Sequence, residues 1–320
     1  MASTALRPRQ AAAAHPGWPE ARFNLSGLFV LDGLILQARH HARERFDFAL
    51  PIDSVHGAPA VPWNGGRRSH AFPSVGGMER GVQLLNAEGI GVFFTFTNHL
   101  LEAQHLQDAT CNHLLELIDN ASGLNGVILA SDRLTEHVAQ RHPRLRRYAS
   151  AVKTTMERVR DAAGYRALAQ RYHRVVLHPD DGVNAELVSQ LDPSRFEVLL
   201  NEPCVRGCPS RERHYELLAQ LQLAGRYDLE LEEANRHHER SVCRMPLRVP
   251  GERRRDANLD GDEVRALYRL GFRHFKLQGR TDVAANFAYD LTRYLVEPDV
   301  VGPGLFKALM ASLSAPSSAS

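Results

Sequence analysis

Two thiols and a carboxylate follow the apolar run 196–200, which is typical of a buried strand. Glu202 is a candidate acid or base for proton transfer. Cys204 and Cys208 enclose a short segment that contains Gly207, so both thiolates can reach one metal ion. These side chains add little to packing at a strand end. They suit catalysis, because loops at the carboxyl ends of barrel strands converge on one mouth.

The two remaining cysteines, Cys111 and Cys243, extend the metal hypothesis. Four thiolates are the usual ligands of an iron–sulfur cluster, and they serve equally for a structural zinc ion. We predict a metal centre held by Cys204, Cys208 and Cys243, with Cys111 or a histidine such as His237 as the fourth ligand. The alternative for Cys111 is a small buried apolar residue, which is common for a free cysteine.

Other polar residues stand where predicted strands end, and these complete the candidate site. Besides Glu202, the candidate catalytic residues are His178 and Lys276. The candidate substrate-binding residues are Asp53, Asn64, Arg67, Asn98, Asn201 and Arg280.

Lys276 lies in a strand pattern in which it shares one face with His274 and Gln278. The other face of a barrel strand packs against helices, so this polar face is expected inside the barrel. A lysine there is either an anion-binding or Schiff-base group, or it forms a structural ion pair with Glu202.

Eight strand patterns, each followed by a helical pattern, position these residues. The predicted strands are 22–25, 48–53, 92–97, 126–131, 147–152, 174–178, 196–200 and 272–277. Continuous apolar strands that alternate with helices indicate a parallel sheet covered on both faces. We therefore predict an α/β protein with a (β/α)8 TIM-type barrel. An open doubly wound sheet is the alternative, but the chain has no G-x-G-x-x-G sequence.

The barrel is expected to span residues 21–298. The long charged segment 225–255 lacks a strand pattern, and we interpret it as an insertion over the mouth before the last strand. Residues 1–20 and 313–320 are expected to be a disordered lead and tail.

The composition is that of an ordinary globular protein, with 43% hydrophobic and 24% charged residues. The net charge of +2 gives no global preference for nucleic acid or for an anionic membrane. No apolar run is long enough to cross a bilayer. Four cysteines are too few for a disulfide framework, so a reducing cytoplasm is the expected compartment.

The motifs around Glu202, Cys204 and Cys208, with the K-x-x-G-R sequence that begins at Lys276, resemble the collagenase-like peptidase family. This is the group of peptidase U32-like barrels, and segment 201–215 looks like an uncharacterised branch of it. The resemblance implies a barrel that binds a four-iron cluster through four cysteines. It also implies oxygen-independent hydroxylation of ubiquinone precursors or RNA bases in some members, and peptidase activity in others.

Four functions follow from the residues and the resemblance together. The first is an iron–sulfur enzyme that modifies, by hydroxylation for example, a small carboxylated or phosphorylated molecule or an RNA base. The second is a peptidase or other hydrolase, with or without zinc. The third is a lyase that uses Lys276 as a Schiff-base nucleophile. The fourth is a non-catalytic partner of a paralogous barrel protein.

Overall fold

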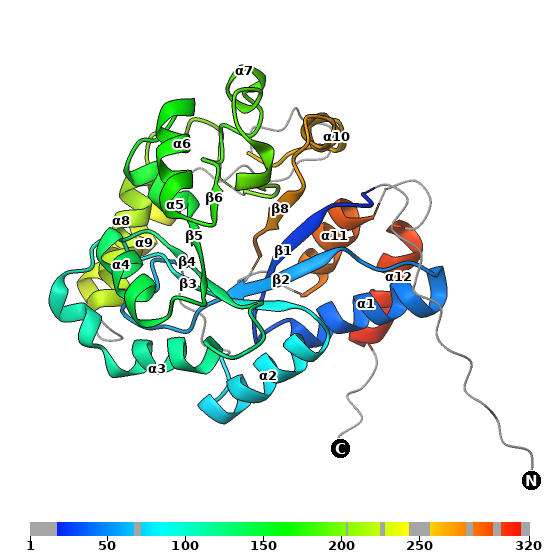
Figure 1. The fold of residues 1–320 in the computed structure, drawn as a ribbon, viewed down its shortest axis with the longest axis horizontal. Coiled ribbons are helices and arrows are strands. Elements are labelled where there is room, and N and C mark those ends of the chain that lie inside the picture. The colour runs from blue at the N-terminus through cyan, green and yellow to red at the C-terminus, as the bar shows by residue number, and fades with distance from the viewer. Residues whose placement is uncertain are drawn as a thin grey trace, which may run out of the picture.

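The computed structural model describes residues 18–66, 72–202, 204–224, 228–242, 257–279, 284–296 and 302–314. Within them the chain forms a closed barrel of eight parallel strands in sequence order, with β8 paired to β1. The strands are β1 (Arg22–Ser26), β2 (Ile52–Gly57), β3 (Gly91–Phe96), β4 (Gly126–Leu129), β5 (Arg146–Ala149), β6 (Arg174–Val176), β7 (Phe196–Leu199) and β8 (His274–Leu277). Helices surround these strands (Figure 1). The predicted (β/α)8 architecture is confirmed.

Several of the helices between the strands begin where a short polar side chain caps the first turn. Ser131, Ser150, Asp161 and Asp260 each accept a hydrogen bond from a backbone amide of the helix that follows. The helices of the first half are α1 (Asp32–Phe46), α2 (Val75–Ala87), α3 (Ala109–Ile118), α4 (Asp132–Arg141), α5 (Ala151–Met156) and α6 (Ala162–Arg171). Those of the second half are α7 (Ala185–Val188), α8 (Arg211–Ala224), α9 (Leu229–His237), α10 (Gly261–Arg269), α11 (Ala284–Leu295) and α12 (Gly302–Ser314).

The barrel interior is apolar on one side and polar on the other. Phe93, Ile128 and Tyr148 form a small apolar cluster that is separate from the main core between strands and helices. Across from it, Asn24 of β1 donates to the Glu197 carboxylate of β7 at 3.3 Å. Barrel interiors are usually filled by branched apolar side chains, so a buried glutamate here needs polar neighbours to offset its desolvation.

The polar face of β8 points into this interior, as its alternation predicts. Lys276 Nζ lies 3.9 Å from Glu197 Oε2, and Arg174 Nη2 lies 2.9 Å from His274 Nε2. The structure gives Lys276 an ion pair with Glu197, a carboxylate that the sequence did not single out as its partner, while a pair with Glu202 stays a prediction. Glu197 sits in the strand itself, whereas Glu202 lies beyond its end.

The predicted position of β2 was also wrong. The sequence pattern favoured 48–53, but the strand runs from Ile52 to Gly57. Asp53 is therefore the second residue of β2 and lies toward the amino end of the barrel, away from the mouth. The apolar run 48–52 misled because the interior-facing residues of this strand, Ser54 and His56, are polar.

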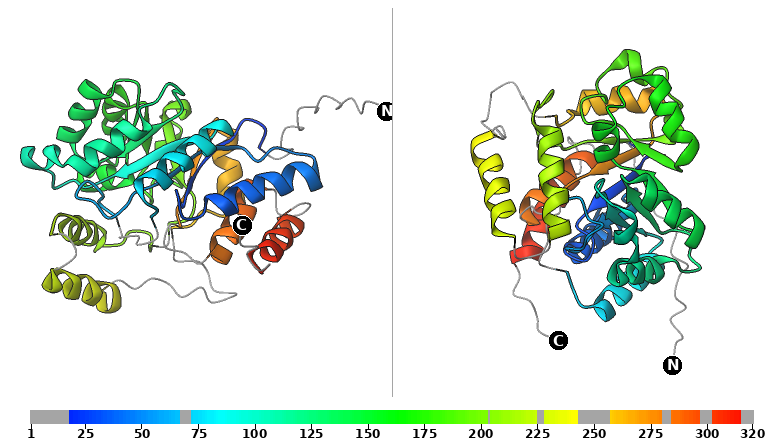
Figure 2. Two further views of the ribbon diagram at one scale, coloured as in Figure 1. Left: turned by 90° about the horizontal axis from the view of Figure 1, so that it is seen from below. Right: turned by 90° about the vertical axis from the view of Figure 1, so that its left-hand side faces the viewer.

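The ends of the chain and the insertion differ in detail from expectation. Trp18 is buried and its ring centroid lies 5.2 Å from that of Tyr268, so this residue of the predicted lead packs against α10. Helix α12, which was not predicted, packs against α1 and α11 (Figure 2). The described part of the insertion forms α9 and the π-helical turn η3 (His238–Val242), and α9 packs along α8 (Figure 2).

No helix among the described ranges has both the length and the apolar character that a membrane span requires.

Candidate active site

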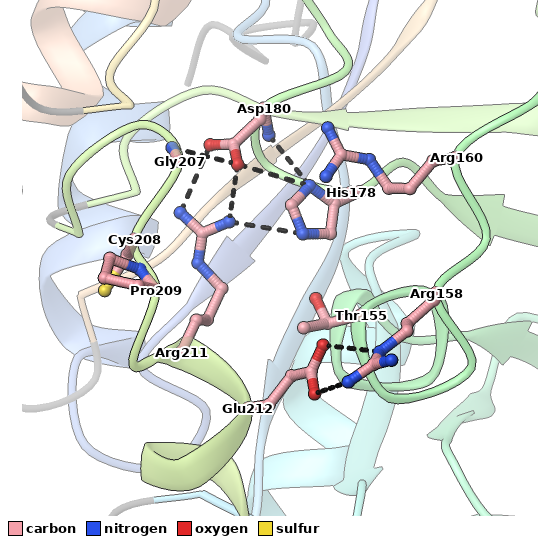
Figure 3. A pocket seen from close by; sticks show the side chains of 10 residues that line it. All are labelled: Thr155, Arg158, Arg160, His178, Asp180, Gly207, Cys208, Pro209, Arg211 and Glu212. Atoms are coloured by element: carbon pink, nitrogen blue, oxygen red, sulfur yellow. Dashed lines mark hydrogen bonds and ion pairs between the residues drawn. The ribbon is translucent and has the colours of Figure 1, made fainter.

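A cavity of about 220 Å³ lies at the carboxyl ends of β5, β6 and β7 (Figure 3). The segments that follow these three strands line it, and they include residues of α5 and of the first turn of α8. The lining residues are Thr155, Arg158, Arg160, His178, Asp180, Gly207, Cys208, Pro209, Arg211 and Glu212. In barrel enzymes this end of the strands carries the active site.

A buried ion pair between Arg211 and Asp180 forms one wall of the cavity. Arg211 Nη1 and Nη2 lie 3.0 and 3.2 Å from the two carboxylate oxygens of Asp180. The two side chains are only 4% and 12% exposed. Burial opposes both charges, but the mutual hydrogen bonds prevail, so the pKa of Arg211 is raised and that of Asp180 is lowered. The pair joins the loop after β6 to the first turn of α8.

His178 contacts this pair and is held neutral. Its Nε2 lies 3.2 Å from Arg211 Nη1, and a guanidinium has no acceptor, so Nε2 accepts this hydrogen bond. Burial lowers the pKa of His178 to about 4, and the charges of Arg160 and Arg211 act in the same direction. The imidazole is therefore uncharged at neutral pH. The prediction that His178 lies in the site cavity agrees with its position, while its catalytic role stays a prediction.

Behind His178, a chain of hydrogen bonds fixes the loop after β6. The backbone amide of His178 donates to the Tyr165 hydroxyl at 2.8 Å. That hydroxyl donates to Asp181 Oδ2 at 2.7 Å, and Arg160 holds the other carboxylate oxygen at 2.7 Å. Asp181 is buried and thus carries a paired charge.

Glu202 lies beyond the end of β7, in the segment that leads to the cavity-lining residues Gly207 and Cys208. Its Oε1 accepts the backbone amide of Cys204 at 3.2 Å, and its Oε2 accepts Gln278 Nε2 at 2.5 Å. Tyr215 of α8 interacts electrostatically with Glu202 and Arg211. Burial raises the pKa of the Tyr215 hydroxyl, and the charge of Glu202 raises it further, so the hydroxyl keeps its proton at neutral pH.

The structure brings two of the predicted metal ligands together. The thiols of Cys204 and Cys208 interact with each other. Burial raises the pKa of Cys204 to about 12, and the charge of Glu202 contributes to this shift. Neither cysteine is in a disulfide.

Cys111 is placed differently, because it is buried in α3 where its thiol meets the backbone of Trp63. Burial strongly raises its pKa, which disfavours the thiolate that a metal needs. Among the described residues, no group of three or more His, Cys, Asp or Glu side chains could hold a metal ion. Cys243 lies outside those residues. Two thiols alone do not make a cluster site, so we derive no reaction step through a metal.

Asn201 joins β7 to β8 and α11 instead of facing the cavity. Its Nδ2 donates to Asp290 Oδ2 at 3.0 Å and to the Gln278 carbonyl at 2.9 Å. Its Oδ1 accepts the Gln278 amide at 2.7 Å. These bonds position the segment that carries Glu202 relative to the last strand.

Asn64 and Asn98 hold loops together through backbone partners. Asn64 binds the carbonyl of Pro59 and the amide of Gly66 within its own loop. The side-chain Nδ2 of Asn98 donates to the carbonyls of Pro62, at 2.8 Å, and Ala219, at 3.1 Å. Their substrate-binding role stays a prediction. Arg67 and Arg280 lie outside the described residues.

The sequence did not reveal the arginines of the cavity. Arg158 and Arg160 follow α5, a short helix that was not predicted and whose first two residues were assigned to the strand 147–152. Residues 153–158 were expected to connect that strand to the next helix, and neither arginine was singled out, although Ser150 is a clear helix cap. Arg211 follows Cys208 closely, and its position at the start of a helix after β7 was the available signal.

The fold and this site together define a (β/α)8 barrel with an ionic cavity at its mouth. No family model and no curated protein matches the sequence. The fold is similar to the solved structure of the U32 peptidase Mk0906, with a TM-score of 0.50 and 15% sequence identity over 85% of this chain and 97% of that one. The resemblance seen in the sequence is thereby confirmed for the fold.

Proposed function

We propose that this protein is a hydrolase that cleaves a peptide or amide bond at the mouth of its barrel, with Glu202 as the general base. The observation that carries the proposal is the buried Glu202 carboxylate beyond the end of β7, which accepts hydrogen bonds from the Cys204 amide and from Gln278 in the segment that leads to an ionic cavity. The fold likeness to a U32 peptidase supports hydrolysis among the reactions that such a site can perform.

In the proposed reaction, Glu202 takes a proton from water while the water oxygen attacks the carbonyl carbon. The Tyr215 hydroxyl, which stays protonated, donates a hydrogen bond to the oxygen that becomes negative. The carbon–nitrogen bond then breaks, and the amine leaves with the proton that Glu202 returns. No oxidant or reductant is needed.

The test is turnover of a mixture of short peptides, followed by mass spectrometry, with the wild type and two variants. Glu202→Gln keeps the shape of the side chain and removes the base, so we expect kcat/KM to fall about 100-fold or more. The matched control is Glu233→Gln, at an exposed glutamate of α9, which we expect to retain activity. Equal activity of Glu202→Gln and wild type would reject the assignment.

The contact between Cys204 and Cys208 favours a second candidate, an iron–sulfur or zinc centre that includes Cys243. Metal analysis of anaerobically purified protein distinguishes the candidates. Stoichiometric iron or zinc in the wild type that is lost in Cys204→Ala would support a centre. Metal-free protein that hydrolyses peptides would reject it.

A further inference from the structure

Three guanidinium groups line the cavity, and they differ in how buried their carboxylate partners are. Arg211 and Arg160 pair with the buried carboxylates of Asp180 and Asp181. These two pairs are fixed parts of the wall, because breaking a buried pair leaves an uncompensated charge.

The third arginine, Arg158, forms an exposed pair that a ligand can exchange. Its Nε and Nη2 lie 3.0 and 2.9 Å from the two oxygens of Glu212. The two side chains are 77% and 42% exposed. Such a pair contributes little net stability in water. An incoming anion can therefore replace the Glu212 carboxylate on the same two donors, as planar guanidinium geometry favours.

Further donors in the cavity have no protein partner. Nη1 of Arg158 and Nη1 of Arg160 bind no acceptor among the described residues. Arg158 is mostly exposed and Arg160 is about half-exposed, so these donors are open to an acceptor that a ligand would supply.

The electrostatics agree with this geometry. Burial disfavours a proton on His178, and the charges of Arg160 and Arg211 disfavour it further, in spite of two nearby carboxylates. A positive field that opposes an imidazolium ion favours an anion in the same place. His178 therefore lines the cavity as a neutral group, and it neither attracts nor repels a bound anion by charge.

We propose that this cavity binds the carboxylate or phosphate group of the substrate, with Arg158 exchanging Glu212 for the ligand and Arg160 providing a second contact (Figure 3). An anionic group thus defines the substrate class of the proposed hydrolase. That the bound anion is a substrate rests on the proposed function, whereas anion binding itself does not. A peptide substrate would present its terminal carboxylate here. A phosphorylated substrate would present its phosphate.

Calorimetric titration of the full chain tests the proposal with three probes. They are inorganic phosphate, a short N-acetylated peptide with a free carboxylate, and the same peptide as its terminal amide. We expect the amide not to bind, and binding of either anion supports the cavity and identifies the source of the charge. Absence of binding by both anions would overturn it.

Three variants locate the site. Arg158→Gln is expected to weaken anion binding at least tenfold. Glu212→Gln is expected to strengthen it several-fold, because the competing carboxylate is gone. The matched control is Arg213→Gln, which breaks a similar exposed Arg–Glu pair of α8 outside the cavity. It is expected to bind like the wild type. Binding by Arg158→Gln that equals the wild type would overturn the proposal.

Anion binding and peptide hydrolysis can be tested separately. Glu202→Gln is expected to bind the anion while losing turnover. Anion binding without any peptide hydrolysis would contradict the hydrolase and leave the anion site standing.

Discussion

His178 links the electrostatics of the cavity to the stability of the fold. Its imidazole lies in the loop after β6, buried against Arg211, and its pKa is lowered to about 4. An unfolded histidine has a pKa of about 6.5. The unfolded chain therefore binds a proton in a pH range in which the folded protein does not.

This difference predicts a loss of stability in acid. The contribution of His178 is complete above pH about 6.5 and is lost as the pH falls toward about 4, by about 1–3 kcal/mol. Urea unfolding at pH about 7 and about 5 measures it. His178→Gln should reduce the pH dependence, while His113→Gln, at a half-exposed site of α3, should not. Burial also lowers the pKa of His274, so the wild type loses stability in acid through more than one histidine. The pH dependence of each variant is therefore compared with that of the wild type. Equal slopes for His178→Gln and the wild type would contradict this account.

At the same scale, the sequence predicted single residues well where a strand end was clear. Glu202 and His178 follow the apolar runs of β7 and β6, and both lie at the mouth. Tyr215 and Arg211 were not singled out, because a residue on a helix shows its contacts only once the helix is docked. Asp53 was misplaced because its strand was misplaced.

Between elements, the loops after β2 and β3 approach each other closely at Gly65. A Cβ built on Gly65 would lie 2.2 Å from the Thr97 carbonyl oxygen and 2.7 Å from the Asn98 amide nitrogen. The Trp63 carbonyl accepts the Asn98 amide at 3.0 Å and ties the two loops together. Only glycine fits this approach, because backbone cannot move aside as a flexible side chain can.

We therefore expect Gly65→Ala to destabilise the protein by about 2–3 kcal/mol, as overpacking does. Gly33→Ala is the control. A Cβ on Gly33, in the first turn of α1, meets nothing within 4 Å, so this change should be neutral or stabilise by up to about 1 kcal/mol. Urea unfolding compares the two. A Gly65→Ala protein as stable as Gly33→Ala would show that the loops separate easily.

A strand could be predicted from the sequence where all of its residues are buried and apolar. β3 is buried on both faces, and its apolar run is evident in the sequence. β2 faces the polar side of the barrel interior, so its residues alternate and the apolar run before it was preferred. The short helix α5 was missed for a related reason, since its first two residues, Ala151 and Val152, are apolar and were assigned to the strand 147–152.

Over the whole molecule, closure of the barrel brings distant segments to one mouth. Arg158, Asp180 and Arg211 belong to three successive β/α units, and the parallel pairing of β5 with β6 and of β6 with β7 places the segments after these strands around one cavity. The count of eight units was enough to predict the barrel. The off-centre cavity over β5 to β7 was not predictable, because it depends on which loops are long enough to fold back over the rim.

The central claim is hydrolysis with Glu202 as the base, and turnover in water enriched in ¹⁸O tests it most directly. For any peptide or amide that the protein cleaves, the account predicts one solvent oxygen in the newly formed carboxylate. It also predicts that this labelled product disappears in Glu202→Gln but not in Glu233→Gln. A product without solvent oxygen, or the same yield of labelled product from Glu202→Gln as from the wild type, would contradict the account.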